Sequence, residues 1–153
     1  MKNIALLAMV LFSVSLLAQP TSYGELMKIS EELERGSALV KREIVGRSVE
    51  GREIIALHFS KSGIDADKSK IKVLIHAQQH GNEQSGKEGA LLLARELVKD
   101  EYACLFDRID LVIVPQVNPD GSEKNERRNS NGMDLNRNHL IMTEPEVIAL
   151  HGL

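Results

Sequence analysis

Two apolar runs with a helix-forming segment between them constrain the fold of this chain most strongly. The runs Val73–Ile75 and Ile109–Val114 are short, apolar and rich in β-branched residues, which predicts two buried strands. Between them, Ser85–Lys99 repeats leucine and alanine at helical spacing, which predicts an amphipathic helix. A strand, a helix and a strand in this order predict a right-handed crossover between parallel strands, and therefore an α/β fold.

The flanking segments add further elements to this unit. Thr21–Arg35 has apolar residues at helical spacing, with Thr21 or Ser22 as a cap. Leu39–Val45 and Arg52–Phe59 predict two strands of a hairpin, and Thr143–Leu150 predicts a helix that Thr143 caps. We therefore expect a mixed central sheet flanked by helices.

The first eighteen residues have the pattern of a signal peptide. Met1–Asn3 carries a positive charge, Ile4–Leu17 is apolar apart from two serines, and Ala18 is a small residue at a plausible cleavage point. The apolar run is short for a membrane span, which needs about 20 residues. We expect a signal peptide at residues 1–18, one domain at 19–153, export to the periplasm or the extracellular space, and no stable membrane insertion after cleavage. The alternative is an uncleaved N-terminal anchor.

Composition excludes some classes of partner. The 153 residues have a formal net charge of only −3, and they include no Trp, two Tyr and three Phe. Neither a basic surface for nucleic acid nor an aromatic platform for stacking bases is expected, so we predict no nucleic-acid partner. Cys104 is the single cysteine, which excludes an internal disulfide.

His80 and Glu83 follow the first buried strand at the point where α/β proteins place their ligands. The crevice outside the carboxyl ends of the strands is the usual binding position in such sheets. Imidazole nitrogen and carboxylate oxygen are both zinc donors, and Gly81 between them permits a tight turn. By itself this pair is weak evidence, because an ordinary solvated turn has the same composition.

A long polar segment, Ser122–Asn138, holds three arginines. One interpretation is a solvated surface loop, with Met133 and Leu135 as its only candidates for the core. The other is a recognition loop, because the planar guanidinium group binds a carboxylate through two hydrogen bonds.

Four motifs in order resemble one known family, the zinc carboxypeptidases related to carboxypeptidase A. They are His80–Glu83, Asn118–Gly121, Arg127–Asn129 and Gly132–Asn138, and the upstream hairpin Gly46–Arg52 is also similar to the family's. The resemblance runs from about residue 22 to the end of the chain. It implies an α/β fold with a mixed sheet, of which this chain would be the N-terminal half, truncated at the C-terminus.

The resemblance also implies roles for single residues. His80 and Glu83 match the first two zinc ligands, so Zn²⁺ is the expected cofactor. Arg127 matches the catalytic residue that polarises the scissile carbonyl group. Three further residues are expected to bind the substrate: Asn136 and Arg137 would hold its terminal carboxylate, and Arg128 is the neighbouring candidate for the role of Arg127.

The family's remaining catalytic residues are expected beyond Leu153. They are the third zinc ligand, a histidine on a later strand, and the glutamate that acts as general base. We do not expect His139 or His151 to replace that ligand, since His151 falls in a predicted helix. His76 precedes His80 by four residues, roughly 13 Å along a strand, which favours a core or supporting role.

The expected function is zinc-dependent hydrolysis of a peptide or amide bond next to a free carboxylate. The substrate would be a peptide or amide with such a carboxylate, and the 153-residue chain alone is expected to be inactive. One alternative is an N-acyl amino acid deacylase of the same fold, because those relatives share the His-Gly-Asn-Glu turn. Another is a non-catalytic fragment that binds carboxylates without turnover. The Gly46–Arg52 hairpin and the Asn-Pro-Asp-Gly turn favour the peptidase.

Overall fold

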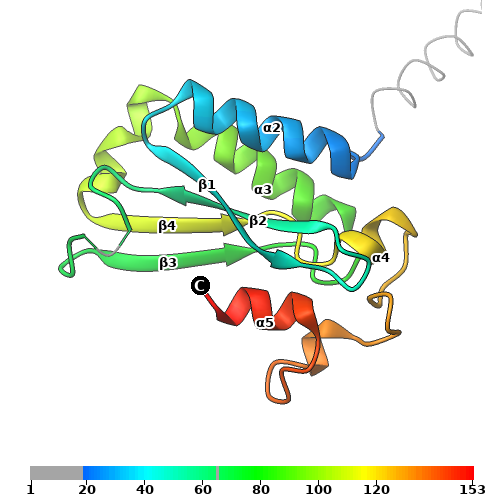
Figure 1. Ribbon diagram of the computed structural model, residues 1–153. Helices are drawn as coiled ribbons and strands as arrows, with labels where there is room; N and C mark the ends of the chain where they lie inside the picture. Colours follow the sequence, from blue (N-terminus) through cyan, green and yellow to red (C-terminus); the bar gives the residue numbers. More distant parts are fainter. Residues whose placement is uncertain (1–18, 65) are drawn as a thin grey trace, which may run out of the picture.

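The central feature of the fold is a four-stranded mixed sheet (Figure 1). A computed structural model describes residues 19–64 and 66–153, so the predicted signal peptide lies outside the described residues. In spatial order the strands are β1 (Val40–Arg47), β2 (Glu53–Phe59), β4 (Ile109–Val114) and β3 (Ile71–His76). β2 is antiparallel to both of its neighbours, and β3 is parallel to β4. The predicted α/β class, mixed sheet and parallel crossover are therefore confirmed.

Helices cover both faces of the sheet (Figure 1). α2 (Tyr23–Gly36) and α3 (Gln84–Leu97) lie on one face, and α5 (Pro145–His151) lies on the other. Three short helical segments sit in the connections: η1 (Asp100–Asp107), α4 (Pro119–Glu123) and η2 (Leu135–Arg137). Within residues 19–64 and 66–153, no helix is both long and apolar enough to cross a bilayer.

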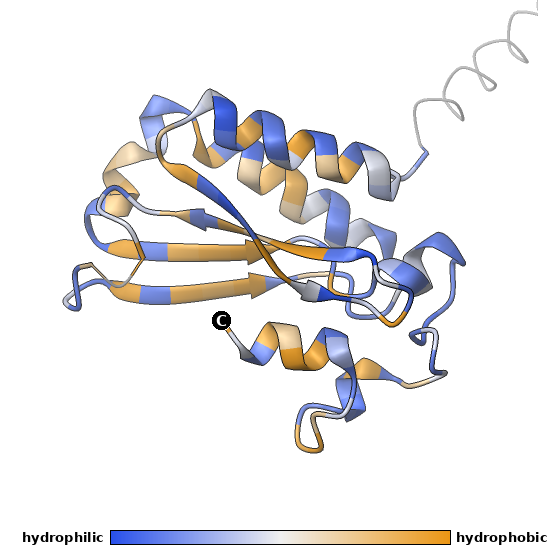
Figure 2. Cartoon of the chain, in the orientation of Figure 1, coloured by the Kyte–Doolittle hydropathy of each residue, from blue (hydrophilic) through white to orange (hydrophobic). Residues whose placement is uncertain are grey.

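The alternation of side chains along β2 builds two separate cores. Leu57 and Phe59 point to one face, where they pack with Ala94 of α3. Ile54 and Ala56 point to the other face, where they join the buried residues of α5. Since successive strand residues face opposite sides, one strand serves both layers. The hydropathy colouring shows the strands as the apolar centre of the fold (Figure 2).

The predicted helix starts are confirmed at one end of the chain and wrong at the other. Ser22 caps α2, and its hydroxyl pairs with Glu25 in a reciprocal capping box. At α5 the N-cap position is Glu144 and not Thr143, without a side-chain cap. The Thr143 hydroxyl instead accepts a hydrogen bond from the buried amide of Asn138, which takes it away from the helix.

β3 is not the buried strand that its composition predicts. Ile71 and Leu74 keep 66% and 46% of their surface exposed. Among the described residues β3 pairs only with β4 and forms the edge of the sheet. β4 lies between two strands and is largely buried, as expected.

Candidate functional site

The loops that leave β3 and β4 run side by side past the ends of these strands. The amide of Ala77 donates to the carbonyl of Val114, and the amide of Val117 donates back to Ala77. The next pair extends the contact, because the amide of Asn118 donates to the carbonyl of Gln78 at 3.1 Å. The turn at residues 80–83 is thereby brought against the turn at residues 118–121, in the crevice where the sequence predicted a site.

Two glycines let these turns and the polar segment 122–138, called the arginine loop below, approach one another closely. A Cβ atom on Gly81 would lie 2.1 Å from the carbonyl carbon of Gly121 and 2.4 Å from the amide of Ser122. A Cβ atom on Gly121 would lie 2.5 Å from the carbonyl oxygen of Arg128. The amide of Gly81 also donates to the carbonyl of Arg127 at 3.3 Å. Glycine is required here because backbone meets backbone with no room for a side chain.

Gln78 connects the same loops through the hydrogen bonds of its side chain, a role that the sequence did not indicate. Its backbone has a positive φ of 49°, which costs a non-glycine residue free energy unless its surroundings hold it there. The buried amide nitrogen of Gln78 donates to Gly81 carbonyl, Gln84 Oε1 and Ser122 Oγ at 2.8–2.9 Å. Its oxygen accepts from Gln116.

His80 lies between two carboxylates. Its Nδ1 is 2.9 Å from Oε1 of Glu83, and its Nε2 is 3.0 Å from Oδ1 of Asp134. Arg127 contacts both acids, with Nε at 3.2 Å from Oδ2 of Asp134 and a terminal nitrogen at 3.4 Å from Oε1 of Glu83. Four side chains from two segments, the turn at residues 80–83 and the polar segment 122–138, therefore converge at the start of α3.

Asp134 is the member of this cluster that sequence reasoning missed. Burial alone would raise the pKa of Asp134, but hydrogen bonds from His80 and Arg127 outweigh burial and hold the pKa below its ordinary value. Asp134 therefore stays ionised and accepts a hydrogen bond from the N–H at Nε2 of His80. Its signal in the sequence was its place inside the Gly132–Asn138 motif, two residues before Asn136.

Glu83 has the freedom to bind a ligand. It occupies the N-cap position of α3 without capping the helix through its side chain, so its carboxylate is turned toward His80. The side chain of Glu83 is 57% exposed, whereas that of His80 is only 10% exposed. The positive end of the helix dipole stabilises an anion at this position.

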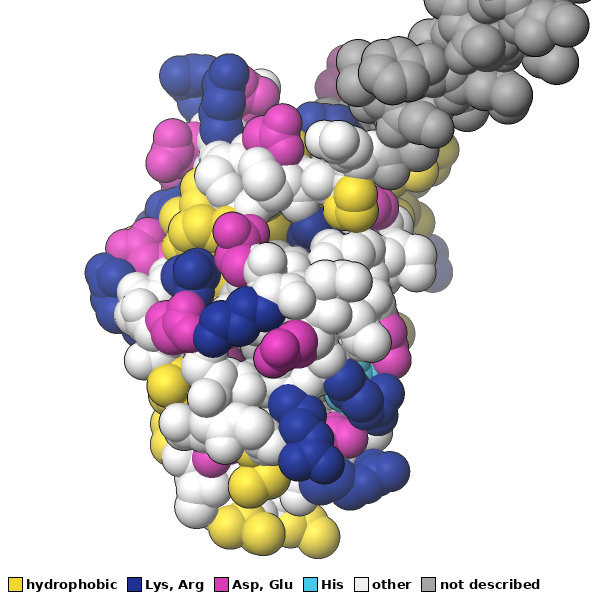
Figure 3. Space-filling model, turned by 90° about the vertical axis from the view of Figure 1, so that its right-hand side faces the viewer, with side chains coloured by type: hydrophobic (Ala, Val, Ile, Leu, Met, Phe, Trp, Pro, Cys, Tyr) yellow, Lys and Arg dark blue, Asp and Glu magenta, His cyan; other side chains and the backbone are white. Residues whose placement is uncertain are grey.

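The other predicted site residues lie around this cluster with different environments. Asn136 lines a cavity of about 510 Å³ that His80 and Glu83 also line. Within residues 19–64 and 66–153, the guanidinium group of Arg137 has no hydrogen-bond or ion-pair partner. Arg128 folds back on its own loop and donates to the carbonyl of Gly132 at 2.8 Å. On this side of the molecule, basic side chains surround a partly visible histidine (Figure 3).

A buried carboxylate, Asp120, connects the β1–β2 hairpin to the Asn-Pro-Asp-Gly turn. Oδ1 accepts from the hydroxyl of Ser48 and from Arg52, both at 2.7 Å, and Oδ2 accepts from the amide of Glu50 at 2.9 Å. Two of the motifs that carried the family resemblance are therefore one structural unit. The hairpin supports the turn, and the turn supports the loop of His80.

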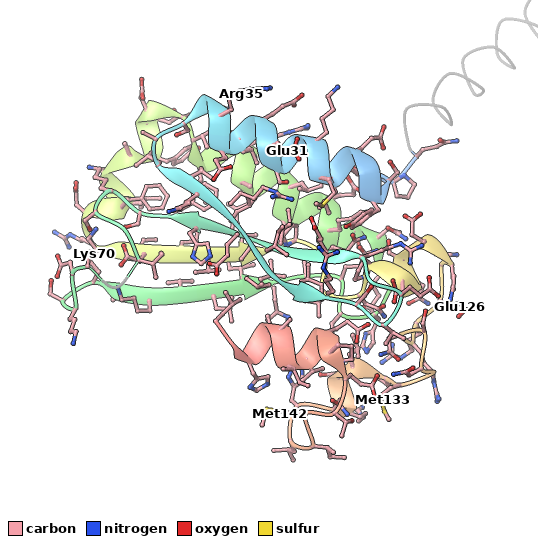
Figure 4. The ribbon with its side chains drawn as sticks, viewed as in Figure 1. Glu31, Arg35, Lys70, Glu126, Met133 and Met142 are labelled. Atoms are coloured by element: carbon pink, nitrogen blue, oxygen red, sulfur yellow. The ribbon has the colours of Figure 1, made fainter. Side chains whose placement is uncertain are left out.

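The arginine loop is not simply a solvated loop. Figure 4 labels Glu126 and Met133 along it, both exposed, yet the segment also contains buried residues. Leu135 is fully buried, and the amide of Asn129 donates to two glutamates, Glu144 and Glu146. Met133, the other candidate for the core, is 36% exposed. The loop is fixed to α5 through these contacts.

His80 and Glu83 supply two donor atoms for a metal. In the described ranges 19–64 and 66–153, no group of three or more His, Cys, Asp or Glu residues is arranged to hold a metal ion. Nδ1 of His80 is the available ligand atom, because Nε2 is occupied by Asp134. Around a tetrahedral zinc, donors at about 2.0–2.2 Å from the metal lie roughly 3.3 Å apart, so the observed 2.9 Å needs only a small opening.

The sequence favoured a core or a supporting role for His76, and the structure contradicts the core. His76 ends β3 with an exposed side chain on the same cavity that His80 lines. His151 is in the last turn of α5, as expected.

Comparison with known proteins agrees with these motifs. The family model described as zinc carboxypeptidase matches residues 27–147. Carboxypeptidase Z from Mus musculus is 28% identical over 142 residues, which cover 80% of this chain and 22% of that protein. The chain thus spans about a fifth of this relative's length.

Solved structures share the fold. A metallo-carboxypeptidase from Burkholderia cenocepacia superposes with a TM-score of 0.76 at 30% identity, covering 86% of this chain and 37% of that one. A metallo-carboxypeptidase from Pseudomonas aeruginosa, in complex with (2-guanidinoethylmercapto)succinic acid, has a TM-score of 0.72 at 32% identity and covers 86% of this chain and 36% of that one. Because the family model matches most of this chain, the chain belongs to the zinc carboxypeptidase family.

Proposed function

We propose that this chain is the N-terminal part of an exported zinc metallocarboxypeptidase that hydrolyses a peptide or amide bond next to a free carboxylate. One observation carries the proposal: Nδ1 of His80 and Oε1 of Glu83 converge at 2.9 Å in an open crevice, with the second histidine nitrogen already held by Asp134. Export rests on the signal-peptide pattern of residues 1–18.

His80 and Glu83 are the residues of this chain that would hold the zinc. A bound zinc would supply Lewis acidity and lower the pKa of a ligated water. Asp134 fixes the tautomer and the orientation of His80, and it increases the basicity of Nδ1. Glu83 contributes the negative charge that offsets the charge of the cation.

The arginines and Asn136 would act on the substrate. Arg127 reaches within 3.4 Å of Oε1 of Glu83, so its guanidinium group is close enough to stabilise charge on a carbonyl oxygen beside the metal. Asn136 lies on the cavity, and the unpaired fork of Arg137 suits a terminal carboxylate. Arg128 is the neighbouring candidate for the role of Arg127, although its guanidinium group donates to the carbonyl of Gly132.

Two observations support the peptidase over the deacylase. Asp120 joins the hairpin to the Asn-Pro-Asp-Gly turn, so the features that favoured the peptidase form one unit. The relative from Pseudomonas aeruginosa was solved with a succinic acid derivative, and succinic acid carries carboxylates. The expected ligand class is therefore a peptide or amide with a free carboxylate.

The test compares two variants of the protein that contains this chain. Glu83→Gln should lower zinc content and activity together, because it removes the charge that balances the cation. Arg137→Lys should keep zinc but lose the preference for a free over an amidated terminus by roughly 10- to 100-fold, the value of a charged bidentate contact of about 1.5–3 kcal/mol. That preference is a ratio of kcat/KM values within each variant.

Arg35→Lys, an exposed substitution on α2 far along the chain from the site, is the matched control (Figure 4). It should change neither zinc content nor the preference. If Arg137→Lys loses zinc while Glu83→Gln keeps it, the metal and carboxylate assignments are wrong. Hydrolysis of N-acyl amino acids in preference to peptides would favour the deacylase.

A further inference from the structure

Three histidines gather at a second position, which adjoins the cavity of His80 and Glu83 through His76. They come from three elements: His76 ends β3, His139 follows η2, and His151 ends α5. Nδ1 of His139 lies 2.9 Å from Nε2 of His151, and the two rings are tilted with centroids 5.2 Å apart. The ring of His76 has its centroid 6.4 Å from that of His139.

We propose that His139 and His151 form a second metal site, which takes a transition-metal cation such as Cu²⁺, Ni²⁺ or Zn²⁺ through Nδ1 of His139 and Nε2 of His151. Bonds of about 2.0–2.1 Å to two imidazole nitrogens that meet at a right angle, as in the square-planar coordination that Cu²⁺ and Ni²⁺ favour, place these nitrogens roughly 3 Å apart, whereas the tetrahedral angle of Zn²⁺ needs roughly 3.3 Å. The observed separation of 2.9 Å therefore matches a pair of ligands on one ion. Imidazole donors select these metals over Mg²⁺ and Ca²⁺, which prefer oxygen.

The backbone that carries His139 is held in place by Asn138. This side chain is fully buried, and its oxygen accepts from the amides of Thr143 and Glu144, both at 3.0 Å. These bonds close the loop between η2 and α5, in which Met142 lies below α5 in the view of Figure 4. His139 stands at the base of this loop and not at its tip.

The helix that carries His151 is fixed as well. Val147, Ala149 and Leu150 bury one face of α5 against the sheet. The packing is tight enough that a Cβ atom on Gly46 of β1 would lie 2.5 Å from the Cβ atom of Ala149. Both ligand-bearing segments are thus anchored through buried groups, which keeps the two nitrogens together without a metal.

Gln79 contacts the second nitrogen of His139. The side-chain amide of Gln79 lies against Nε2 of His139 in a short contact. With a metal on Nδ1, Nε2 carries the proton and donates a hydrogen bond to the amide oxygen of Gln79, because the two ends of the amide are interchangeable by a half-turn. Such a partner fixes the tautomer and the ring orientation of a metal-binding histidine.

The remaining coordination positions are open. His151 and His76 are exposed and His139 is half-buried, so water can complete the shell. The ring of His76, with its centroid 6.4 Å from that of His139, is a further imidazole beside the pair. In the described ranges no three such groups surround one point already, so the site as built is a two-histidine site.

The test measures Cu²⁺ binding in a background that lacks the first site. The background variant is Glu83→Gln, and the second substitution is His139→Asn or His151→Asn. Isothermal titration at pH 7.5 and electron paramagnetic resonance of the bound copper report affinity and nitrogen ligation. Each second substitution should weaken Cu²⁺ binding at least tenfold and remove the signal of two coordinated imidazoles.

His58→Asn in the same background is the matched control, because His58 is a histidine on β2 that lies beside Glu43 and not in the cluster. It should leave both copper readouts unchanged. Circular dichroism melting of every variant shows that the fold is retained. Unchanged copper affinity and an unchanged resonance spectrum in the His139 and His151 variants would overturn the proposal and leave the pair as a hydrogen bond between two histidines.

Discussion

Replacing Gly81 with alanine tests how the site is built. The new Cβ atom would lie 2.1–2.5 Å from three backbone atoms, which belong to Gly121, Ser122 and Glu126. Ordinary carbon contacts begin at about 3.5 Å, so each of these atoms would have to move by about 1 Å or more. No rotamer change relieves this overlap, because the obstructing atoms are backbone.

The expected loss of stability follows from these distances. Overpacking costs typically about 1–3 kcal/mol, and the hydrogen bond from the Gly81 amide to Arg127 contributes about 1 kcal/mol more when it is broken. We therefore expect Gly81→Ala to lower the free energy of unfolding by about 3 kcal/mol. For a domain of roughly 150 residues this corresponds to a fall in Tm of about 6–12 °C.

The assay is urea unfolding followed by far-UV circular dichroism, with Gly89→Ala as the matched control. Gly89 lies in the middle of α3, where a Cβ atom would meet nothing within 4 Å. The same substitution there should raise stability by about 0.5–1 kcal/mol, since alanine favours the helix. Equal midpoints for the two variants, or a Gly81→Ala chain as stable as the wild type, would refute the close approach of the loops.

Three further predictions concern carboxylates. In the protein that contains this chain, Asp134→Asn should weaken zinc binding about 10- to 100-fold in a chelator competition, because it removes the carboxylate that orients His80. Asp107→Asn, on the exposed surface, should leave zinc binding unchanged. Asp120→Asn should lower the free energy of unfolding, measured by urea unfolding, by about 1.5–3 kcal/mol, because the buried carboxylate accepts three hydrogen bonds. The exposed substitution Glu32→Gln should change this free energy by under about 0.5 kcal/mol. Burial raises the pKa of Glu146 above 4.5, so its protonated form favours folding and its contribution is lost as pH rises from 4.5 through the raised pKa. Glu146→Gln should therefore gain stability relative to the wild type as the pH rises from 5 to 7.5, roughly the span above an ordinary carboxyl pKa. A difference in the free energy of unfolding that stays constant over this range would contradict the burial argument.

Local sequence patterns predicted most of the secondary structure. The crossover from β3 through α3 to β4 was found with its boundaries within a few residues, because hydrophobic periodicity reports which faces of an element are apolar. The same patterns failed for the burial of β3, since an apolar run does not say how many neighbours a strand has. They also failed for Thr143, whose hydroxyl is taken by Asn138 from outside the helix.

The sequence by itself determined the residue types of the site and the order of its motifs, so His80, Glu83 and the arginines could be named without a structure. Only the tertiary structure decided how they are connected. Asp134 reaches His80 across 54 residues, and Asp120 holds Ser48 across 72. His139 and His151 meet because one buried asparagine closes the loop between them. Such pairings depend on where packed backbones meet, and that follows from the packing of the whole domain and not from the spacing of residues along a single segment.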